Sequence, residues 1–264
     1  MPDLATYGRW AVIAGGSEGV GAEFARLLAE AGVNLVLIAR KPGPLQDTAQ
    51  RCREIGVDVR TVATDLLAPT AVEQITGATA GLDVGLLIYN AGASTCNEPF
   101  LDAPLDDFRK VLDLNVTRMM ELVQHYARPM VARQRGGVLI VGSLSGYMGA
   151  DRHSVYGGAK AFSRIFAESL WLELREHNVD VVELVLGVTR TPAMERVGLN
   201  FDVPGMIVND PADVAAEGLA NLANGPVHIA GGNAAIAAAN NAPDRAKVVL
   251  QAHERMRRLI NRGA

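Results

Sequence analysis

The chain has 264 residues, of which 49% are hydrophobic and 20% are charged, and this composition excludes a largely disordered protein. Its formal net charge is −4, so neither a nucleic acid nor an anionic membrane surface is expected as the main partner. Neither a signal-peptide pattern nor an apolar run of about 18 residues is present, which favours a cytoplasmic protein without a membrane span.

Seven short apolar runs alternate along the chain with longer segments of helical periodicity. The runs are nearly continuous in apolar residues, which is typical of strands buried on both faces of a parallel sheet. They cover Trp10–Ala14, Asn34–Ala39, Val57–Ala63, Val84–Tyr89, Val138–Gly142, Val179–Leu186 and Val227–Ala230. Helical spacing is clearest in Gly21–Ala31, Leu105–Val131 and Ser154–His177. The alternation predicts an α/β, Rossmann-like fold: a doubly wound seven-stranded parallel sheet with helices on both faces.

No linker, repeat or low-complexity segment divides the chain, so residues 1–264 are expected to form a single dinucleotide-binding and catalytic domain. The segment Thr189–Ile207 carries Pro, Gly and apolar residues without clear periodicity. Irregular insertions in compact domains are commonly lids, so this segment is the predicted substrate lid at about 189–207. A helical pattern after the last strand predicts a C-terminal extension at about 243–262.

The first strand runs directly into a glycine-rich turn that a helix follows at once. Glycine allows close approach of the backbone to a pyrophosphate, and a helix N-terminus offers N–H groups and a positive dipole end. The spacing is G-x-x-x-G-x-G rather than the more general G-x-G-x-x-G, and a turn needed only for packing is the alternative. The predicted cofactor-binding residues here are Gly15, Ser17, Glu18, Gly19, Val20 and Gly21.

Two adjacent cations, Arg40 and Lys41, follow the second strand, and Ala39 stands where an acidic residue would bind the ribose of NAD. Arginine and lysine both bind phosphate, which favours NADP(H) as the cofactor and leaves NAD(H) as the alternative. An ordinary surface pair would have the same sequence, and the charge of Glu18 weakens the electrostatic case for phosphate.

Tyr156 and Lys160 are four residues apart and therefore share one face of the helix that follows the fifth strand. A phenol has a pKa of about 10, and a cation held beside it lowers that value. A tyrosine so placed can give a proton to a carbonyl oxygen or take one from an alcohol. Ser143 ends the fifth strand, at the edge where open α/β sheets bind ligands. Asn115 interrupts a helical pattern, which indicates either a polar task or a local kink.

Together these residues resemble the short-chain dehydrogenase/reductase family, from Arg9 to about Gly232. The resemblance implies that Gly15, Gly19 and Gly21 form the dinucleotide turn. It implies a catalytic set in which Asn115 supports a proton-relay water and Lys160 also binds the nicotinamide ribose; the set is Ser143, Tyr156, Lys160 and Asn115.

The same resemblance implies further cofactor contacts beyond the glycine turn. Asp65 is expected at the adenine, and Val188, Thr189 and then Thr191 are the candidates to hold the nicotinamide amide. The remaining cofactor-binding candidates are Leu66, Asn90, Ala91 and Gly92, together with Tyr156 and Lys160.

Three positions depart from the family pattern. Ala14 replaces a threonine and Tyr89 replaces an asparagine, so weaker hydrogen bonding around the glycine turn is expected. Leu186 replaces a proline before Gly187, which puts the packing against the nicotinamide in doubt.

The residues therefore predict an NADP(H)-preferring oxidoreductase that interconverts a carbonyl and a secondary alcohol. The segments Ser94–Phe100 and Leu144–Met148 flank the inferred site, and with the lid they would make a largely apolar pocket, which favours a hydrophobic small-molecule substrate. An apolar lid that only packs on the core is the alternative. The alternatives are a 3-oxoacyl thioester reductase and a catalytically silent nucleotide-binding regulatory protein of the same fold. No metal site is expected, because the histidines and cysteines lack ligand spacing. The resemblance implies a homodimer or homotetramer that shares the two long helices.

Overall fold

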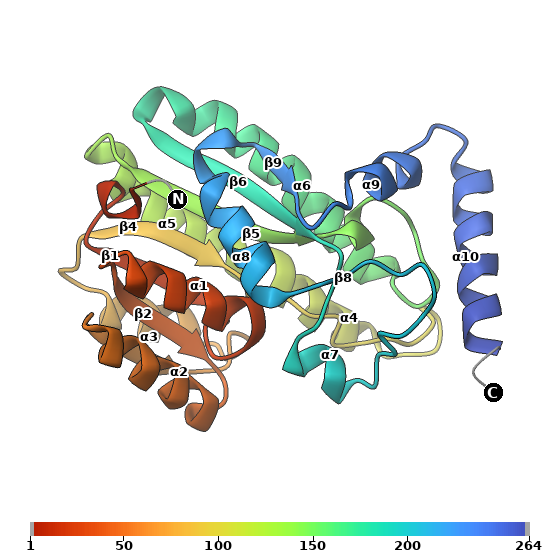
Figure 1. Ribbon diagram of the computed structural model, residues 1–264, viewed down its shortest axis with the longest axis horizontal. Helices are drawn as coiled ribbons and strands as arrows, with labels where there is room; N and C mark the ends of the chain where they lie inside the picture. The colour runs from red at the N-terminus through yellow and green to blue at the C-terminus, as the bar shows by residue number, and fades with distance from the viewer. Residues whose placement is uncertain (1–2, 262–264) are drawn as a thin grey trace.

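The computed structural model describes residues 3–261, with side chains described as far as Glu254. Seven parallel strands form one sheet in the order β3-β2-β1-β4-β5-β6-β9 (Figure 1). Their bounds are β1 Trp10–Ala14, β2 Asn34–Ala39, β3 Val59–Ala63, β4 Val84–Tyr89, β5 Gly136–Ser143, β6 Val179–Leu186 and β9 Val227–Ile229. The predicted seven-stranded, doubly wound parallel sheet is confirmed.

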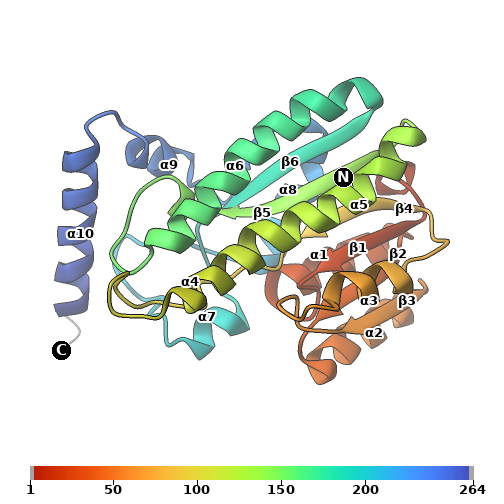
Figure 2. The same cartoon turned by 180° about the vertical axis from the view of Figure 1, so that it is seen from behind.

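Helices cover both faces of this sheet, as Figure 1 and the reverse view in Figure 2 show. One apolar cluster joins the sheet to helices α1, α2 and α8, and a second joins the other face to α3, α5 and α6. These helices are α1 Gly19–Glu30, α2 Pro42–Ile55, α3 Ala71–Ala78, α5 Arg118–Ala132, α6 Ser154–Leu174 and α8 Pro211–Ala220. The inner strands are almost fully buried because apolar side chains pack on both of their faces, whereas the edge strands β3 and β9 are only partly buried.

Several predicted bounds were wrong at the ends of elements. The fifth strand begins at Gly136 rather than Val138. Two glycines start it because the strand packs closely against helix α5 there: a Cβ on Gly136 would lie 2.4 Å from Met130. The third strand begins at Val59 rather than Val57, after the left-handed Gly56 that ends α2. The helix predicted over Ser154–His177 ends at Leu174 and continues as a 3-10 turn to His177.

The single long helix predicted over Leu105–Val131 is in fact two helices. Helix α4, Leu105–Leu112, and α5 are joined by a π-helical turn over Asp113–Thr117. Asn115 lies in this turn and is buried. The interruption that asparagine made in the helical pattern therefore marks a π-bulge, a feature frequently found at functional sites.

The remaining elements gather at one end of the sheet. Two short strands, β7 Val188–Thr189 and β8 Val208–Asn209, pair with each other and enclose the segment that carries helix α7, Pro192–Arg196. Helix α9, Ala234–Asn240, precedes α10, Arg245–Asn261, which lies beyond α9 at the end of the molecule (Figures 1 and 2). The predicted extension began two residues earlier, and its last residue, 262, lies outside the described residues. Among the helices described, none has the length and apolarity to span a membrane.

Candidate active site

The glycine turn lies at the carboxyl end of β1, and its backbone packs so closely that added side-chain atoms would collide with neighbouring atoms. A Cβ on Gly21 would lie 1.9 Å from the Gly15 carbonyl oxygen, and Gly15 has φ +83°. The N–H groups of Gly15 and Gly16 both donate to the carbonyl of Ile38, at 2.8 and 3.1 Å. Glycine is therefore required sterically, and the backbone of the turn stays open to a ligand.

Asn90 braces this turn from the neighbouring strand. Its Nδ2 donates to the Gly15 carbonyl at 2.9 Å, and its backbone N–H donates to the Ala14 carbonyl at 3.0 Å. Ala14 has no hydroxyl to offer, yet its backbone is held by Asn90. The Asn90 amide, a predicted cofactor contact, therefore supports the turn itself at Gly15.

Tyr89, the second departure from the family pattern, is buried and its hydroxyl donates to the Leu114 carbonyl at 2.5 Å. Burial raises the pKa of this phenol above its usual value, so the hydroxyl stays a donor. Leu114 belongs to the π-helical turn that carries Asn115. Tyr89, the last residue of β4, therefore connects this strand with the turn that positions Asn115, a role that the sequence did not indicate.

Asn115 and Lys160 converge on Gly92. A Cβ on Gly92 would lie 2.8 Å from Asn115 Oδ1 and 2.9 Å from Lys160 Nζ, so a glycine is needed for the two side chains to meet there. Asn115 Nδ2 donates to the carbonyls of Ala93 and Val111, at 3.0 and 2.9 Å. Within the described part of the chain, its buried Oδ1 has no hydrogen-bond partner. An acceptor aimed beside a lysine is suited to a water or a ligand hydroxyl.

Lys160 is almost completely buried and its Nζ donates to the Val141 carbonyl on β5 at 3.0 Å. The same Nζ lies 5.8 Å from the centre of the Tyr156 ring. Ser143, at the end of β5, accepts a bond from the Ser145 N–H at 3.1 Å and so caps a short 3-10 turn, Leu144–Gly146. The structure thus holds Tyr156, Lys160 and Ser143 at one edge of the sheet, with Asn115 against the lysine.

The predicted phosphate-binding pair lies at the end of β2. Arg40 is exposed, with its Nη1 4.0 Å from Asp65 Oδ2, and Lys41 is the residue before α2. Asp65 Oδ1 also accepts from the Leu67 N–H at 3.0 Å. Asp65, predicted at the adenine, therefore shares its carboxylate between Arg40 and its own turn. Leu66 is buried, and its carbonyl accepts a bond from Arg118.

Arg196 of α7 forms a bidentate ion pair with the Glu18 carboxylate, which lies just before the start of α1. The Arg196 hydrogen bond lowers the pKa of Glu18, and Lys41 and Arg40 lower it further, against its partial burial. Glu18 makes no capping bond to α1, so its carboxylate does not occupy the helix N-terminus. Glu18, whose charge would oppose phosphate binding, is thus paired with Arg196 of the lid.

The candidates for the nicotinamide amide lie between β6 and α7. Thr189 is buried and its hydroxyl donates to the Gly187 carbonyl at 3.2 Å. Thr191 caps α7 by accepting from the Met194 N–H at 3.3 Å, and it lies against Gly19, where a Cβ would come within 3.0 Å of its methyl group. Val188 is half-buried in β7. Of the three, Thr191 lies over the glycine turn.

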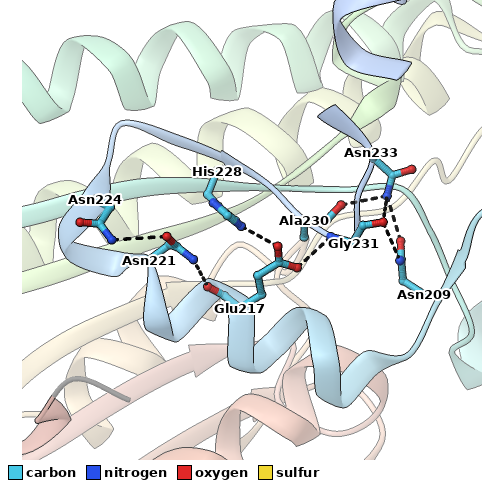
Figure 3. Close-up of polar contacts among 8 residues, drawn as sticks. All are labelled: Asn209, Glu217, Asn221, Asn224, His228, Ala230, Gly231 and Asn233. Carbon is cyan, nitrogen blue, oxygen red and sulfur yellow. Dashed lines mark hydrogen bonds and ion pairs between the residues drawn. The ribbon is translucent and has the colours of Figure 1, made fainter. Parts of the chain in front are cut away.

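A polar network that sequence analysis missed holds the base of the lid (Figure 3). Asn233 is buried, and its Nδ2 lies within hydrogen-bond distance of Asn209 Oδ1 and the carbonyls of Ala230 and Gly231. Glu217 accepts from the Gly231 N–H at 2.8 Å. A Cβ on Gly187 would meet the Asn233 amide at 2.7 Å.

The network thus joins both ends of the lid, at Gly187 and Asn209, to the loop after β9. Scattered asparagines carry no spacing signal, which is why the pattern did not predict it.

The site fits a dinucleotide. The glycine turn leaves no room for side chains, the N-terminus of α1 is not capped by Glu18, and Asn115 presents an unpartnered buried acceptor. In the described residues no group of three or more His, Cys, Asp or Glu side chains is arranged to hold a metal ion.

Residues 9–200 match the short chain dehydrogenase family. The chain belongs to the short-chain dehydrogenase/reductase family, whose members are NAD(P)-dependent oxidoreductases acting on CH–OH and C=O groups of small molecules. This confirms the resemblance, the enzyme class and the Rossmann-type fold predicted from the sequence.

Similar proteins include a dehydrogenase and a reductase. A 7beta-hydroxysteroid dehydrogenase of Mediterraneibacter gnavus is 32% identical over 189 residues, which cover 71% of this chain and 72% of that protein. A very-long-chain 3-oxoacyl-CoA reductase of Podospora anserina is 35% identical over 204 residues, 74% of this chain and 60% of that protein.

Solved structures agree with this assignment. One from a study of 7beta-hydroxysteroid dehydrogenase stereoselectivity is 29% identical with a TM-score of 0.86, over 95% of this chain and 99% of that one. A short-chain dehydrogenase from Sphingobium yanoikuyae in complex with NADPH is 28% identical with a TM-score of 0.78, over 86% and 89%.

Proposed function

We propose that this chain is an NADP(H)-preferring oxidoreductase that interconverts a bulky hydrophobic ketone and its secondary alcohol. The observation that carries the proposal is the convergence of a buried lysine with a tyrosine, a serine and an unpartnered asparagine oxygen at the carboxyl edge of the sheet. Such a set moves one proton at a substrate oxygen. A bound nicotinamide would supply the matching hydride.

Each side chain has one task in this proposal. Tyr156 donates its phenolic proton to the carbonyl oxygen in reduction and removes it from the alcohol in oxidation. Lys160, fixed by Val141, stabilises the phenolate left behind and binds the nicotinamide ribose. Ser143 Oγ hydrogen-bonds the substrate oxygen. Asn115 Oδ1 accepts from a water that returns a proton through Lys160 to Tyr156.

The preference for NADP(H) rests on Arg40 and Lys41 at the end of β2 and on the absence of an acid at Ala39. The pairing of Glu18 with Arg196 supports it, because that acid is then neutralised beside the two cations. Titration with NADPH and NADH, followed by nicotinamide fluorescence, tests it. Arg40→Gln should weaken NADPH binding by about tenfold and leave NADH nearly unchanged; tighter NADH binding by the wild type would overturn the preference.

The substrate class is inferred from apolar side chains around the site. Met194 and Val197 in the lid are exposed, as are Phe100 and Leu101 in the loop after β4. The similar proteins are named for a hydroxysteroid and for very-long-chain 3-oxoacyl-CoA, whose ring system and acyl chain, respectively, are large and apolar. A steroid-like ketone is the first candidate, and a 3-oxoacyl thioester is the second because of the Podospora anserina relative.

The deciding experiment is a panel of steroid ketones, bulky aryl ketones and 3-oxoacyl thioesters with NADPH, scored by loss of absorbance at the nicotinamide band. Turnover of a steroid or aryl ketone and not of thioesters supports the first candidate, and the reverse favours the second. Cofactor binding without turnover of any member would favour the silent regulatory alternative.

We also propose a homodimer or homotetramer that shares α4, α5 and α6. These helices expose large apolar side chains that a monomer would leave in water; they are Leu105, Leu112, Met120, Phe162, Ile165 and Leu172. Light scattering after gel filtration should give two or four times the chain mass, and a monomer at micromolar concentration would overturn this proposal.

A further inference from the structure

Beneath α6, a carboxyl side chain is buried in the middle of the sheet. Glu183 lies on β6, is only 1% exposed, and pairs with Ile140 and Val227 on the neighbouring strands. Its side chain occupies the space left by Gly142, where a Cβ would lie 2.4 Å from Glu183 Oε1. Burying an ionisable carboxyl costs several kcal/mol unless it is well paired, so packing alone does not explain a glutamate here.

Glu183 is connected to the helical turn that bears Lys160. The Ser163 hydroxyl donates to Glu183 Oε1 at 2.7 Å and lies 2.9 Å from the Lys160 carbonyl oxygen. Ser163 is itself buried, one turn after Lys160 on α6. The second carboxyl oxygen, Oε2, is buried and lacks a hydrogen-bond partner among the described residues.

The charges around Glu183 come from α6 and from the turn after β5. Burial raises the pKa of Glu183 to about 7, while the Ser163 hydrogen bond and the charges of Lys160 and Arg164 act in the opposite direction. Glu168 of α6 raises it further. Tyr147, from the turn after β5, has its own pKa raised by burial first and then by Glu183.

From this geometry we propose that Glu183 is a positioning residue that acts through Lys160. Its carboxylate, held by Ser163 under α6, opposes the ammonium charge of Lys160 and so sets the pH range over which Tyr156 exchanges its proton. The proposal rests on the assignment of Tyr156 as proton donor in the proposed function. Lys160 favours the Tyr156 phenolate, and a negative charge that acts on Lys160 weakens this effect, so the two buried charges oppose each other.

Glu183→Gln tests this, because glutamine keeps the shape and the bond from Ser163 and removes only the charge. Titration of the Tyr156 phenol in the cofactor-free protein, followed by NMR of tyrosine labelled at Cζ and assigned with Tyr156→Phe, should move to lower pH by about half a unit to one unit. The alkaline limb of kcat/KM for alcohol oxidation should move by the same amount in the same direction.

Two matched variants separate charge from structure. Ser163→Ala removes the hydrogen bond but keeps the carboxylate, and Glu173→Gln removes an exposed carboxylate from the same helix. In both variants the titration midpoint of the Tyr156 phenol should lie within about 0.2 pH unit of the wild-type midpoint if the charge of Glu183 causes the shift. A Glu183→Gln titration identical to wild type, or an equal shift in Ser163→Ala, would overturn the proposal.

The NMR titration needs no turnover, so the two proposals can fail separately. The titration can be unchanged in an active enzyme, and it can shift in a protein that turns over no ketone. If Glu183→Gln does not fold, the wild-type titration decides: the Tyr156 resonance should report a second ionisation at lower pH, from the Glu183 carboxyl group acting through Lys160, and a single-step curve would count against the inference.

Discussion

The glycine turn, residues 14–21, and the lid, residues 189–207, meet at the same edge of the sheet but are held in opposite ways. The turn is fixed by backbone bonds to Ile38 and by Asn90, and added side-chain atoms would collide with it. The lid is held at its ends, by the β7–β8 pair and the Asn233 network, and most of its side chains are exposed.

The contrast has a physical consequence for function. A turn determined by close backbone packing tolerates one geometry, which suits a constant part of a ligand such as a pyrophosphate. The lid is anchored mainly at its ends, with one partly exposed ion pair from Arg196 to the turn, so its side chains and its path can change at little cost to the fold. The turn is therefore expected to serve the cofactor, and the lid is where substrate preference is expected to lie.

The largest effect is expected from a substitution that changes neither the glycine turn nor the lid. Tyr156→Phe removes only the proton donor, so kcat should fall by about a thousandfold while NADPH affinity stays within about twofold of wild type. Steady-state assays and a fluorescence titration measure the two. Tyr126→Phe, whose hydroxyl lies 3.0 Å from Thr79 far from the site, is the control and should retain full activity. A Tyr156→Phe protein with most of the wild-type rate would contradict the mechanism.

Gly21→Ala breaks the turn. The new methyl group would lie 1.9 Å from the Gly15 carbonyl oxygen and 2.7 Å from Asn90 Nδ2. Overpacking of this kind costs about 1–3 kcal/mol, so NADPH affinity should fall by about tenfold to a hundredfold. Gly43→Ala, in α2 with nothing within 4 Å, is the matched control and should bind NADPH normally. Equal affinities in the two variants would show that the turn does not touch the cofactor.

Asn233→Ala tests the lid through its anchor. Loss of the amide removes the bond to Asn209 Oδ1 and the shorter of the two bonds to the Ala230 carbonyl, and should cost about 1–3 kcal/mol of stability. Because the network holds the lid and not the turn, kcat/KM should fall by about tenfold while NADPH affinity is unchanged. The exposed Asn224, bonded only weakly to Asn221, supplies the control Asn224→Ala. An equal loss of cofactor affinity in Asn233→Ala would remove the distinction between the two regions.

The smallest effect is expected where the regions touch. Arg196→Gln or Glu18→Gln breaks the ion pair between lid and turn, and NADPH should then dissociate about two to five times faster in stopped-flow measurements. The pair is partly exposed, so the difference from wild type should shrink at high salt. The exchanged pair, Glu18→Arg with Arg196→Glu, should recover part of the slow release. If NADPH dissociates from these variants and from the wild type at the same rate at low salt, the ion pair between Glu18 and Arg196 does not slow cofactor release.

Local patterns in the sequence were enough to predict the strands, the glycine turn and the placement of Tyr156 and Lys160 on one helix, because each depends on residues near one another in the chain. The grouping of Ser143 and Asn115 with this pair came from the family resemblance and stays a prediction. Continuous apolar runs predict buried strands, and a spacing of four places Tyr156 and Lys160 on one helix face. Bounds failed where glycine replaced apolar residues, as at Gly136, since packing against Met130 rather than composition decides that strand's start.

Only the tertiary structure decided which distant residues support the site. Tyr89 reaches the carbonyl of Leu114, Glu18 pairs with Arg196, and Glu183 lies under the turn of Lys160; each of these contacts joins segments at least 20 residues apart. The sequence by itself determined the fold and the chemistry, because short-range spacing encodes both. The charge balance and the lid's anchors depend on how elements pack across the sheet, and a single sequence carries no local signal for that.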